Sequence, residues 1–292
     1  MNWIKKKWGD FKGRSFLGKI LFIIKKIFLT LLWLVIVFIF VSVLMWLFKT
    51  PTNNSDWELG MKQLQNVEVE GYIVKEGGSI IEDKNDKFLI KNVRDFDWRK
   101  VGNEENYKNM DFTLSDIRGM EVGISHFSKE NEGLAHVFTI FNLEDGRNIA
   151  VSIETRRDGG EKFGFLKGVF FDYELIYILA TKEDLLSLRE KRGEKIYIYP
   201  INTTAKKAQD IFRSFSKRVN SLYENPEFYH ILFKNCTSLT VDEVKKVSDK
   251  KFSWYEQVLA PGYAAQALFE MDLIKTEEKD FEKMRKEFLI KF

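Results

Sequence analysis

Residues 27–48 form an unbroken run of 22 residues without a charged side chain, an amide side chain or a proline. As a helix with a rise of ~1.5 Å per residue, the run would be ~33 Å long, enough to cross a hydrocarbon core of ~30 Å. A buried core helix is rarely apolar on every face at this length. A signal peptide has a shorter apolar region and a small-residue cleavage site, whereas this run ends in FKTPTNN. We therefore predict a retained transmembrane helix over residues 27–48.

Basic residues gather on the N-terminal side of this run. Residues 1–26 hold eight Lys and Arg against one acid, Asp10, so they carry +7 of a formal net charge of +3 and the rest of the chain carries −4. Basic flanks stay in the cytoplasm. We expect a single-pass protein of the cytoplasmic (inner) membrane, with its N-terminus inside and its main domain extracytoplasmic, or periplasmic. The basic segment then contacts anionic lipid and gives no reason to expect a nucleic-acid partner. Residues 8–26 could also lie on the inner membrane surface as an amphipathic helix.

The rest of the chain has the composition of a globular domain, with 45% hydrophobic and 30% charged residues overall. It is long enough to bury a sizeable core. We predict five parts: a cytoplasmic basic segment (1–26), a transmembrane helix (27–48), a tether (49–66), a catalytic domain (67–274) and a C-terminal helix (275–292).

Turn residues and hydrophobic spacing divide the domain into strands followed by helices. The connection Glu-Asp-Gly-Arg predicts a β-hairpin over residues 133–157, because Gly146 accepts a positive φ. Helix-capping and stop signals at Thr181 and Gly193 enclose a further helix. The fold class is therefore α+β, with a sheet and packed helices. Other strands are expected within 67–101 and at 175–180 and 195–199, and other helices at 203–223, 235–248 and about 254–270.

Cys236 is the one cysteine of the chain. A single cysteine in an exported domain cannot form an internal disulfide, and one Cys with three His shows no metal-ligand spacing, so neither a metal nor another cofactor is expected. The sequence NCTSLTVDEVKKV predicts a helix start, with Asn235 as N-cap. Cys236 would then lie in the first turn, where the free N–H groups and the helix dipole favour the thiolate. It is either a nucleophile or an inert buried thiol.

His136 is the candidate base for this thiol. It lies in the predicted strand AHVFTIF, and Glu154 occupies a comparable place in the partner strand IAVSIET. The hairpin would bring the two side chains to similar height, so that Glu154 could orient the imidazole toward Cys236. The alternatives are a core histidine, a surface charge pair between Glu154 and Arg156, and a cysteine that serves as a small apolar side chain.

Several motifs resemble the family of the Lnb N-terminal periplasmic domain, from about residue 90 to 274. The resemblance implies a circularly permuted papain-like fold, related to NlpC-type peptidases and lecithin–retinol acyltransferase, with an antiparallel sheet and packed helices. It implies Cys236 as nucleophile, His136 as base and Glu154 as third member of the site. Its motifs also contain Asn235, Thr237, Arg156, Tyr173 and Glu174, which would bind substrate or shape the site. The motifs are NVRDFDWR (92–99), AHVFTIF…DGR…AVSIETRR (135–157), GVFFDYELIYILATKEDLLSLR (168–189), IYIYP (196–200), NPEFYHILFKNCTSL (225–239) and PGYAAQALFEMDLI (261–274).

The resemblance also implies an activity. The name-giving member is a lipoprotein N-acyltransferase, which moves an acyl chain from a phospholipid to a lipoprotein. We therefore expect a cysteine-dependent acyltransferase or hydrolase with membrane phospholipid as partner, and a lipoprotein substrate and a membrane-protein partner remain open. The alternatives are an extracytoplasmic cysteine peptidase or amidase acting on cell-wall peptide, and a catalytically silent binding domain. The stretch FGFLKGVFF (163–171) could dip into the bilayer or pack in the core.

Overall fold

The computed structural model describes residues 15–51, 67–69, 87–100, 106–128, 130–157, 161–246 and 261–292. The chain divides into two compact units, Met1–Thr50 and Pro51–Phe292. Most of the predicted tether, the middle of the strand region 67–101, and the start of the helix expected at 254–270 lie outside the described residues.

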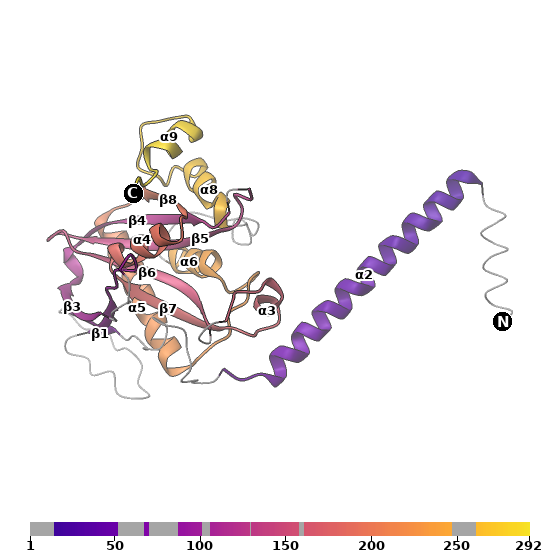
Figure 1. The fold of residues 1–292 in the computed structure, drawn as a ribbon, viewed down its shortest axis with the longest axis horizontal. Helices are drawn as coiled ribbons and strands as arrows, with labels where there is room; N and C mark the ends of the chain where they lie inside the picture. Colours follow the sequence, from indigo (N-terminus) through magenta and orange to yellow (C-terminus); the bar gives the residue numbers. More distant parts are fainter. Residues whose placement is uncertain are drawn as a thin grey trace. The chain divides into compact units, whose positions relative to one another are not determined.

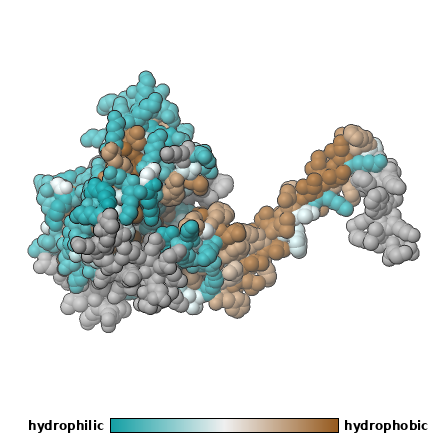
Figure 2. Space-filling view, viewed as in Figure 1, coloured by the Kyte–Doolittle hydropathy of each residue, from teal (hydrophilic) through white to brown (hydrophobic). Residues whose placement is uncertain are grey.

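The first unit contains one long helix, α2 (Phe16–Phe48), of 33 residues (Figures 1 and 2). By length and composition it could cross a membrane, and none of its residues is buried. It begins eleven residues before the apolar run, because Ser15 caps the N–H of Gly18 and no proline interrupts the residues that follow. Residues 16–26 therefore continue the same helix, and the separate amphipathic surface helix suggested for residues 8–26 is not formed over this part.

The second unit is built on a sheet of eight described strands, in the order β1-β2-β7-β6-β5-β4-β8, with β3 paired to β2 (Figure 1). The predicted hairpin is confirmed, with Gly146 at φ 85° in its turn. The prediction of an antiparallel sheet is wrong in one place, because β2 and β7 are parallel at Arg94 and Ala180. The strands are β1 (Val67–Val69), β2 (Lys87–Arg94), β3 (Tyr107–Thr113), β4 (Ile117–His126), β5 (Ala135–Leu143), β6 (Asn148–Arg156), β7 (Glu174–Ala180) and β8 (Lys195–Pro200).

Helices cover both faces of this sheet. One face packs against α4 (Lys182–Lys191) through a cluster that includes Phe138, Ile140 and Leu185. The other carries the larger core, where Phe141 of β5 meets Phe212 and Phe215 of α5 (Ala205–Glu224). Neighbouring strand residues point to opposite faces, so alternate positions of β5 and β6 serve the two cores. The other helices are α3 (Phe165–Val169), α6 (Cys236–Lys245), α8 (Ala264–Glu270) and α9 (Phe281–Glu287), with 3₁₀ turns at Leu114–Asp116 and Pro261–Tyr263.

A buried ion pair fixes α4 to the sheet. Arg94, at the end of β2, donates from Nε and Nη2 to Asp184 at 3.0 and 2.7 Å, and Asp184 also accepts the N–H of Phe96 at 2.8 Å. Both charged side chains are almost fully buried. The ion pair sets the position of α4, which carries a residue of the candidate site.

The C-terminal tail differs from the single helix expected over residues 275–292. Only Phe281–Glu287 is helical. After it, Leu289 pairs with Tyr197, and Ile290 donates its N–H to the carbonyl of Ile196 at 2.9 Å. The backbone groups of an edge strand need partners, and the tail supplies them to β8 (Figure 1).

Candidate active site

The start of α6 holds Cys236 in a fixed frame made by Asn235. The Oδ1 of Asn235 accepts the N–H groups of Thr237 at 2.9 Å and Ser238 at 3.0 Å, and its Nδ2 donates to the carbonyl of Ile231 at 2.8 Å. The capping predicted from the sequence is confirmed. The same hydrogen bonds occupy the N–H groups of Thr237 and Ser238. Among the described residues of this first turn, the N–H of Cys236 itself is the one without a hydrogen-bond partner.

Cys236 meets the sheet where β5 and β6 part. Their paired register ends at Phe138 and Ser152, and one residue further the backbone N–H of Val137 lies close enough to the Cys236 sulfur to lower the pKa of the thiol. The thiol is only 5% exposed. His136, which lies next to Val137 on the same strand, is close enough to the sulfur for each group to shift the pKa of the other. The hairpin end thus supplies both a backbone donor and a side-chain partner to the sulfur.

His136, Ser152 and Glu154 form a hydrogen-bonded chain. The Nε2 of His136 lies 2.7 Å from Ser152 Oγ and 3.2 Å from Glu154 Oε1. Ser152 donates its own proton to Glu154 at 2.8 Å, so its oxygen accepts from Nε2–H of His136. The other ring nitrogen, Nδ1, is then the one left for Cys236. The predicted proximity of His136 and Glu154 is therefore present in the structure.

Arg189 holds the far end of this chain. It reaches Glu154 from α4, with Nη2 at 3.5 Å from Oε1, while Nη1 donates to the carbonyl of Leu185 at 3.1 Å. Its guanidinium lies 4.9 Å from the ring centre of Phe138, and its side chain is among the most buried in the protein. A buried cation beside Glu154 keeps that side chain in its ionised form.

These contacts shift three pKa values. Burial would raise the pKa of Glu154, but His136, Arg189 and the Ser152 hydroxyl outweigh it and hold the pKa well below 4.5. Burial would lower the pKa of His136, but the charges of Glu154 and Cys236 raise it to about 9. Burial would raise the pKa of Cys236, yet the imidazolium and the Val137 N–H lower it below 9.0. The shifts of Cys236 and His136 both favour the thiolate–imidazolium form of the pair over the neutral form.

The other residues proposed from the sequence lie in different positions. Thr237 lies beside the sulfur, with Oγ1 at 4.0 Å. Arg156 and Glu174 form a buried pair at 3.9 Å between β6 and β7. The hydroxyl of Tyr173 accepts the N–H of Gly164 at 2.7 Å, which anchors the segment before α3. These last three residues stabilise surrounding structure rather than contact the thiol.

The remaining histidines are engaged elsewhere. His126 places Nδ1 3.0 Å from the carbonyl of Glu132, and His230 accepts the N–H of Leu232 at 3.2 Å and stacks on Phe233. Burial lowers the pKa of both imidazoles. Neither histidine contacts Cys236, so His136 is the one that the fold brings to the thiol.

Three residues near the thiol were missed from the sequence. Ser152 had a usable signal, because it lies two residues before Glu154 and so on the same face of the strand. Arg189 had no such signal, because it lies on α4 and only the packing of α4 on the sheet brings it to Glu154. Tyr229 is buried, and burial together with the negative charges of Cys236 and Glu154 raises its pKa well above 10. Its hydroxyl therefore stays protonated beside the site.

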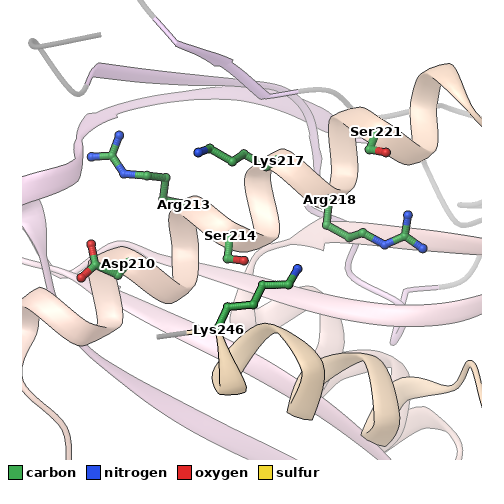
Figure 3. A pocket seen from close by; sticks show the side chains of 7 residues that line it. All are labelled: Asp210, Arg213, Ser214, Lys217, Arg218, Ser221 and Lys246. Carbon is green, nitrogen blue, oxygen red and sulfur yellow. The ribbon is translucent and has the colours of Figure 1, made fainter. Parts of the chain in front are cut away.

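Two hollows flank α6. The first, of about 350 Å³, lies between β4, β5, α5, α6 and α8. Its lining includes Val137 and Thr237, the two residues that also contact the sulfur, and side chains such as Val122, Leu268 and Met271. The second, of about 520 Å³, runs along α5, where Lys246 reaches from the end of α6 toward it (Figure 3). It is lined by charged and hydroxyl side chains and by none of the residues of the hydrogen-bonded chain.

Together, the fold and the site define an α+β domain with helices on both faces of a mixed sheet, a single buried cysteine beside a histidine, and a long apolar helix preceding it. The chain belongs to the family of the Lnb N-terminal periplasmic domain, whose profile matches residues 103–262. This range includes Cys236, His136 and Glu154; the motif at 92–99 and most of that at 261–274 lie outside it. Searches of curated proteins and of solved structures gave no match.

Proposed function

We propose that this protein is a membrane-anchored thiol enzyme that removes an acyl group from a lipid ester and transfers it through a thioester on Cys236 to an amine or to water. The main support is the hydrogen-bonded chain from Glu154 through Ser152 to His136, together with the placement of His136 beside the sulfur of Cys236, where the two groups shift each other's pKa. A nucleophile, a base and a group that orients the base are the parts that this chemistry requires.

The first half-reaction forms the thioester. The thiolate of Cys236 attacks the ester carbonyl carbon, and the electrons of the C=O bond move to the oxygen. When this oxyanion collapses, the bond to the leaving alcohol breaks and His136 gives its Nδ1 proton to that oxygen. The products are an acyl thioester and an alcohol, for example a lysophospholipid. Glu154 and Ser152 hold the imidazole in place throughout.

The second half-reaction releases the acyl group. His136, now neutral, takes a proton from an amine or a water molecule, which attacks the thioester carbonyl and expels the thiolate. The N–H of Cys236 is the first-turn donor open to the oxyanion in both halves, because Asn235 occupies those of Thr237 and Ser238.

The apolar hollow favours an acyl chain over a peptide as the group that is transferred. Its lining is mostly aliphatic. The charged or amide side chains are Asn202, which follows β8, and Lys207 in the first turn of α5, and four threonines supply the other polar groups. A cavity with such walls binds hydrocarbon and offers few partners to peptide groups. Because Val137 and Thr237 line it, a chain inside would end beside the sulfur.

The membrane topology follows from charge and from the family. The excess of Lys and Arg in residues 1–26 supports an N-terminus in the cytoplasm, with α2 crossing the inner membrane and the domain outside. The family is one of periplasmic domains. The chain order, with the histidine strand before the cysteine helix, supports a permuted papain-like relationship. A lipoprotein amine is then the acceptor that the extracytoplasmic membrane surface offers.

The test is the intact mass of the detergent-purified protein after incubation with phospholipid, together with the fatty acid released. Wild type should gain a fatty-acyl mass that hydroxylamine removes, or should release fatty acid if water is the acceptor. Cys236→Ala should do neither. His136→Ala should be strongly impaired, because general-base catalysis contributes ~10²–10⁴-fold. Wild type that neither gains the adduct nor releases fatty acid would contradict the proposal.

A further inference from the structure

Exposed apolar side chains lie in the segments that lead to His136 and to Cys236. In the first of these segments, Phe127 and Leu134 flank the turn between β4 and β5, where the N–H of Phe127 donates to the carbonyl of Leu134 at 3.0 Å. Leu134 is two residues before His136. The two side chains are 57% and 53% exposed, although both are large and apolar.

A second group lies in α3 and in the segment before Cys236. Phe165 and Leu166 begin α3 and are 60% and 62% exposed, and Phe233, three residues before Cys236, is 69% exposed. The segments are joined, because Ile231 donates its N–H to the carbonyl of Gly168 at 3.0 Å. We call the exposed apolar residues of both sides the apolar rim: Phe127, Leu134, Phe163, Phe165, Leu166, Leu232 and Phe233.

Hydrogen bonds join one segment of the rim to the helix turn that carries Cys236. Ser238 of α6 donates from Oγ to the carbonyl of Phe233 at 3.2 Å, and Asn235 donates to that of Ile231 at 2.8 Å. The part of the rim at Leu232 and Phe233 is therefore fixed to the first turn of α6. The opposite end of the hairpin is different, because its tip carries the exposed charges of Glu144, Asp145 and Arg147.

Carboxylates near the rim are paired with basic side chains. Glu132 between Phe127 and Leu134 is bound by Arg285 at 3.1 Å, and Glu161 near Phe163 is bound by Lys167. Glu227 is held by Lys234, next to Phe233. Paired carboxylates cost less to bring to a lipid surface than free ones.

We propose that the apolar rim docks the domain on the lipid bilayer and so brings the thiol to its lipid substrate. The bilayer is the surface within reach of the rim. If α2 spans the membrane, the domain is held near it, because α2 ends at Phe48 and residues 49–66 span at most ~65 Å even when fully extended. Aromatic and aliphatic side chains beside basic ones are typical of segments that enter the headgroup region. The inference extends the proposed function, since it concerns how a lipid reaches the site.

The test measures the surroundings of the rim in the full-length protein. Single cysteines are introduced in a Cys236→Ser chain at Phe233, Phe165 and Leu134, with Glu144→Cys at the hairpin tip as the matched exposed control. Each is labelled with the environment-sensitive dye NBD in vesicles of phosphatidylethanolamine and phosphatidylglycerol. At the three rim positions, emission should shift to the blue, with several-fold stronger quenching by doxyl-labelled lipid than at Glu144→Cys.

A second experiment tests whether the dye enters the bilayer by itself, without the rim side chains. With the label at Leu134→Cys, the added changes Phe165→Ser and Phe233→Ser should increase quenching by aqueous iodide. Rim positions with the same emission and iodide access as Glu144→Cys would overturn the proposal. So would a blue shift without doxyl quenching, which would indicate contact with another protein or a second copy. These chains lack the thiol, so the result is independent of whether acyl transfer occurs.

Discussion

Replacing His136 with glutamine should raise the pKa of the Cys236 thiol to at least 9.0, its value as an unperturbed group. Two influences oppose one another at this sulfur. Burial raises its pKa, and the charge and hydrogen bond of His136 are the main reasons that the net shift is downward. Glutamine keeps a polar side chain at the position but cannot carry the positive charge, so burial would then dominate.

The size of the effect follows from the fraction of thiolate. At pH 6.5 a thiol with a pKa of 9.0 is ionised to only about 0.3%, and the thiolate is the form that reacts with alkylating agents. If the wild-type thiol is largely ionised at this pH, the substitution should slow alkylation by up to ~300-fold. The difference should shrink as the pH rises toward the pKa of the thiol in the substituted protein, because a growing share of that thiol is then ionised.

The assay is the rate of iodoacetamide alkylation of the folded protein as a function of pH, followed by intact mass. His126→Gln is the matched control, because it also removes a buried imidazole but one without contact to the sulfur. It should leave the pH midpoint of alkylation unchanged. Equal midpoints for wild type and His136→Gln would refute the reasoning, and a wild-type thiol that never reacts while folded would show that Cys236 is structural.

Two further predictions concern the support of the site. Glu154→Gln should lower the free energy of unfolding at pH 7 by about 1.5–3 kcal/mol, the usual value for hydrogen bonds to a charged group. Since the folded-state pKa of Glu154 lies well below 4.5, the stability that its ionised form contributes is present above pH 4.5 and is lost as the pH falls further. The difference in Tm between the variant and wild type should therefore narrow at pH 4. A difference in Tm that does not depend on pH would contradict this assignment. Gly123→Ala should destabilise the domain by about 1–3 kcal/mol or more, because a Cβ at this position would lie 2.2 Å from the ring of Phe138, which Arg189 covers on α4. Gly119→Ala on the same strand has nothing within 4 Å of the new Cβ and should melt like wild type; equal melting of both variants would show that Phe138 is free to move.

The features that could be predicted from the sequence rest on short-range rules. The turn around Gly146 set the pairing of β5 and β6, and with it the contact between His136 and Glu154. Asn235 predicted the start of α6, because its side chain can cap the first turn of a helix. The continuous apolar run predicted α2, although its early start at Phe16 depended on the cap at Ser15.

Other features were missed because no local pattern encodes them. β4 is a ten-residue strand with two neighbours, yet its sequence IRGMEVGISH contains two glycines and the charged side chains of Arg118 and Glu121, a composition that does not by itself predict a long strand. The C-terminal residues look helical in isolation, but the unpaired edge of β8 binds Leu289 and Ile290 instead. In both cases, pairing with a distant segment decided the outcome over intrinsic preference.

By itself, the sequence determined the apolar helix, the hairpin that joins His136 to Glu154, and the capped turn that carries Cys236. Only the tertiary structure decided that these parts meet. Cys236 follows His136 by 100 residues, and the sulfur reaches it because α6 packs where β5 and β6 part. Arg189 reaches Glu154 because Asp184 fixes α4 to Arg94 on the opposite side of the sheet from the main core. Contacts of this kind depend on how whole faces pack together, and the spacing of residues along the chain carries no record of that packing.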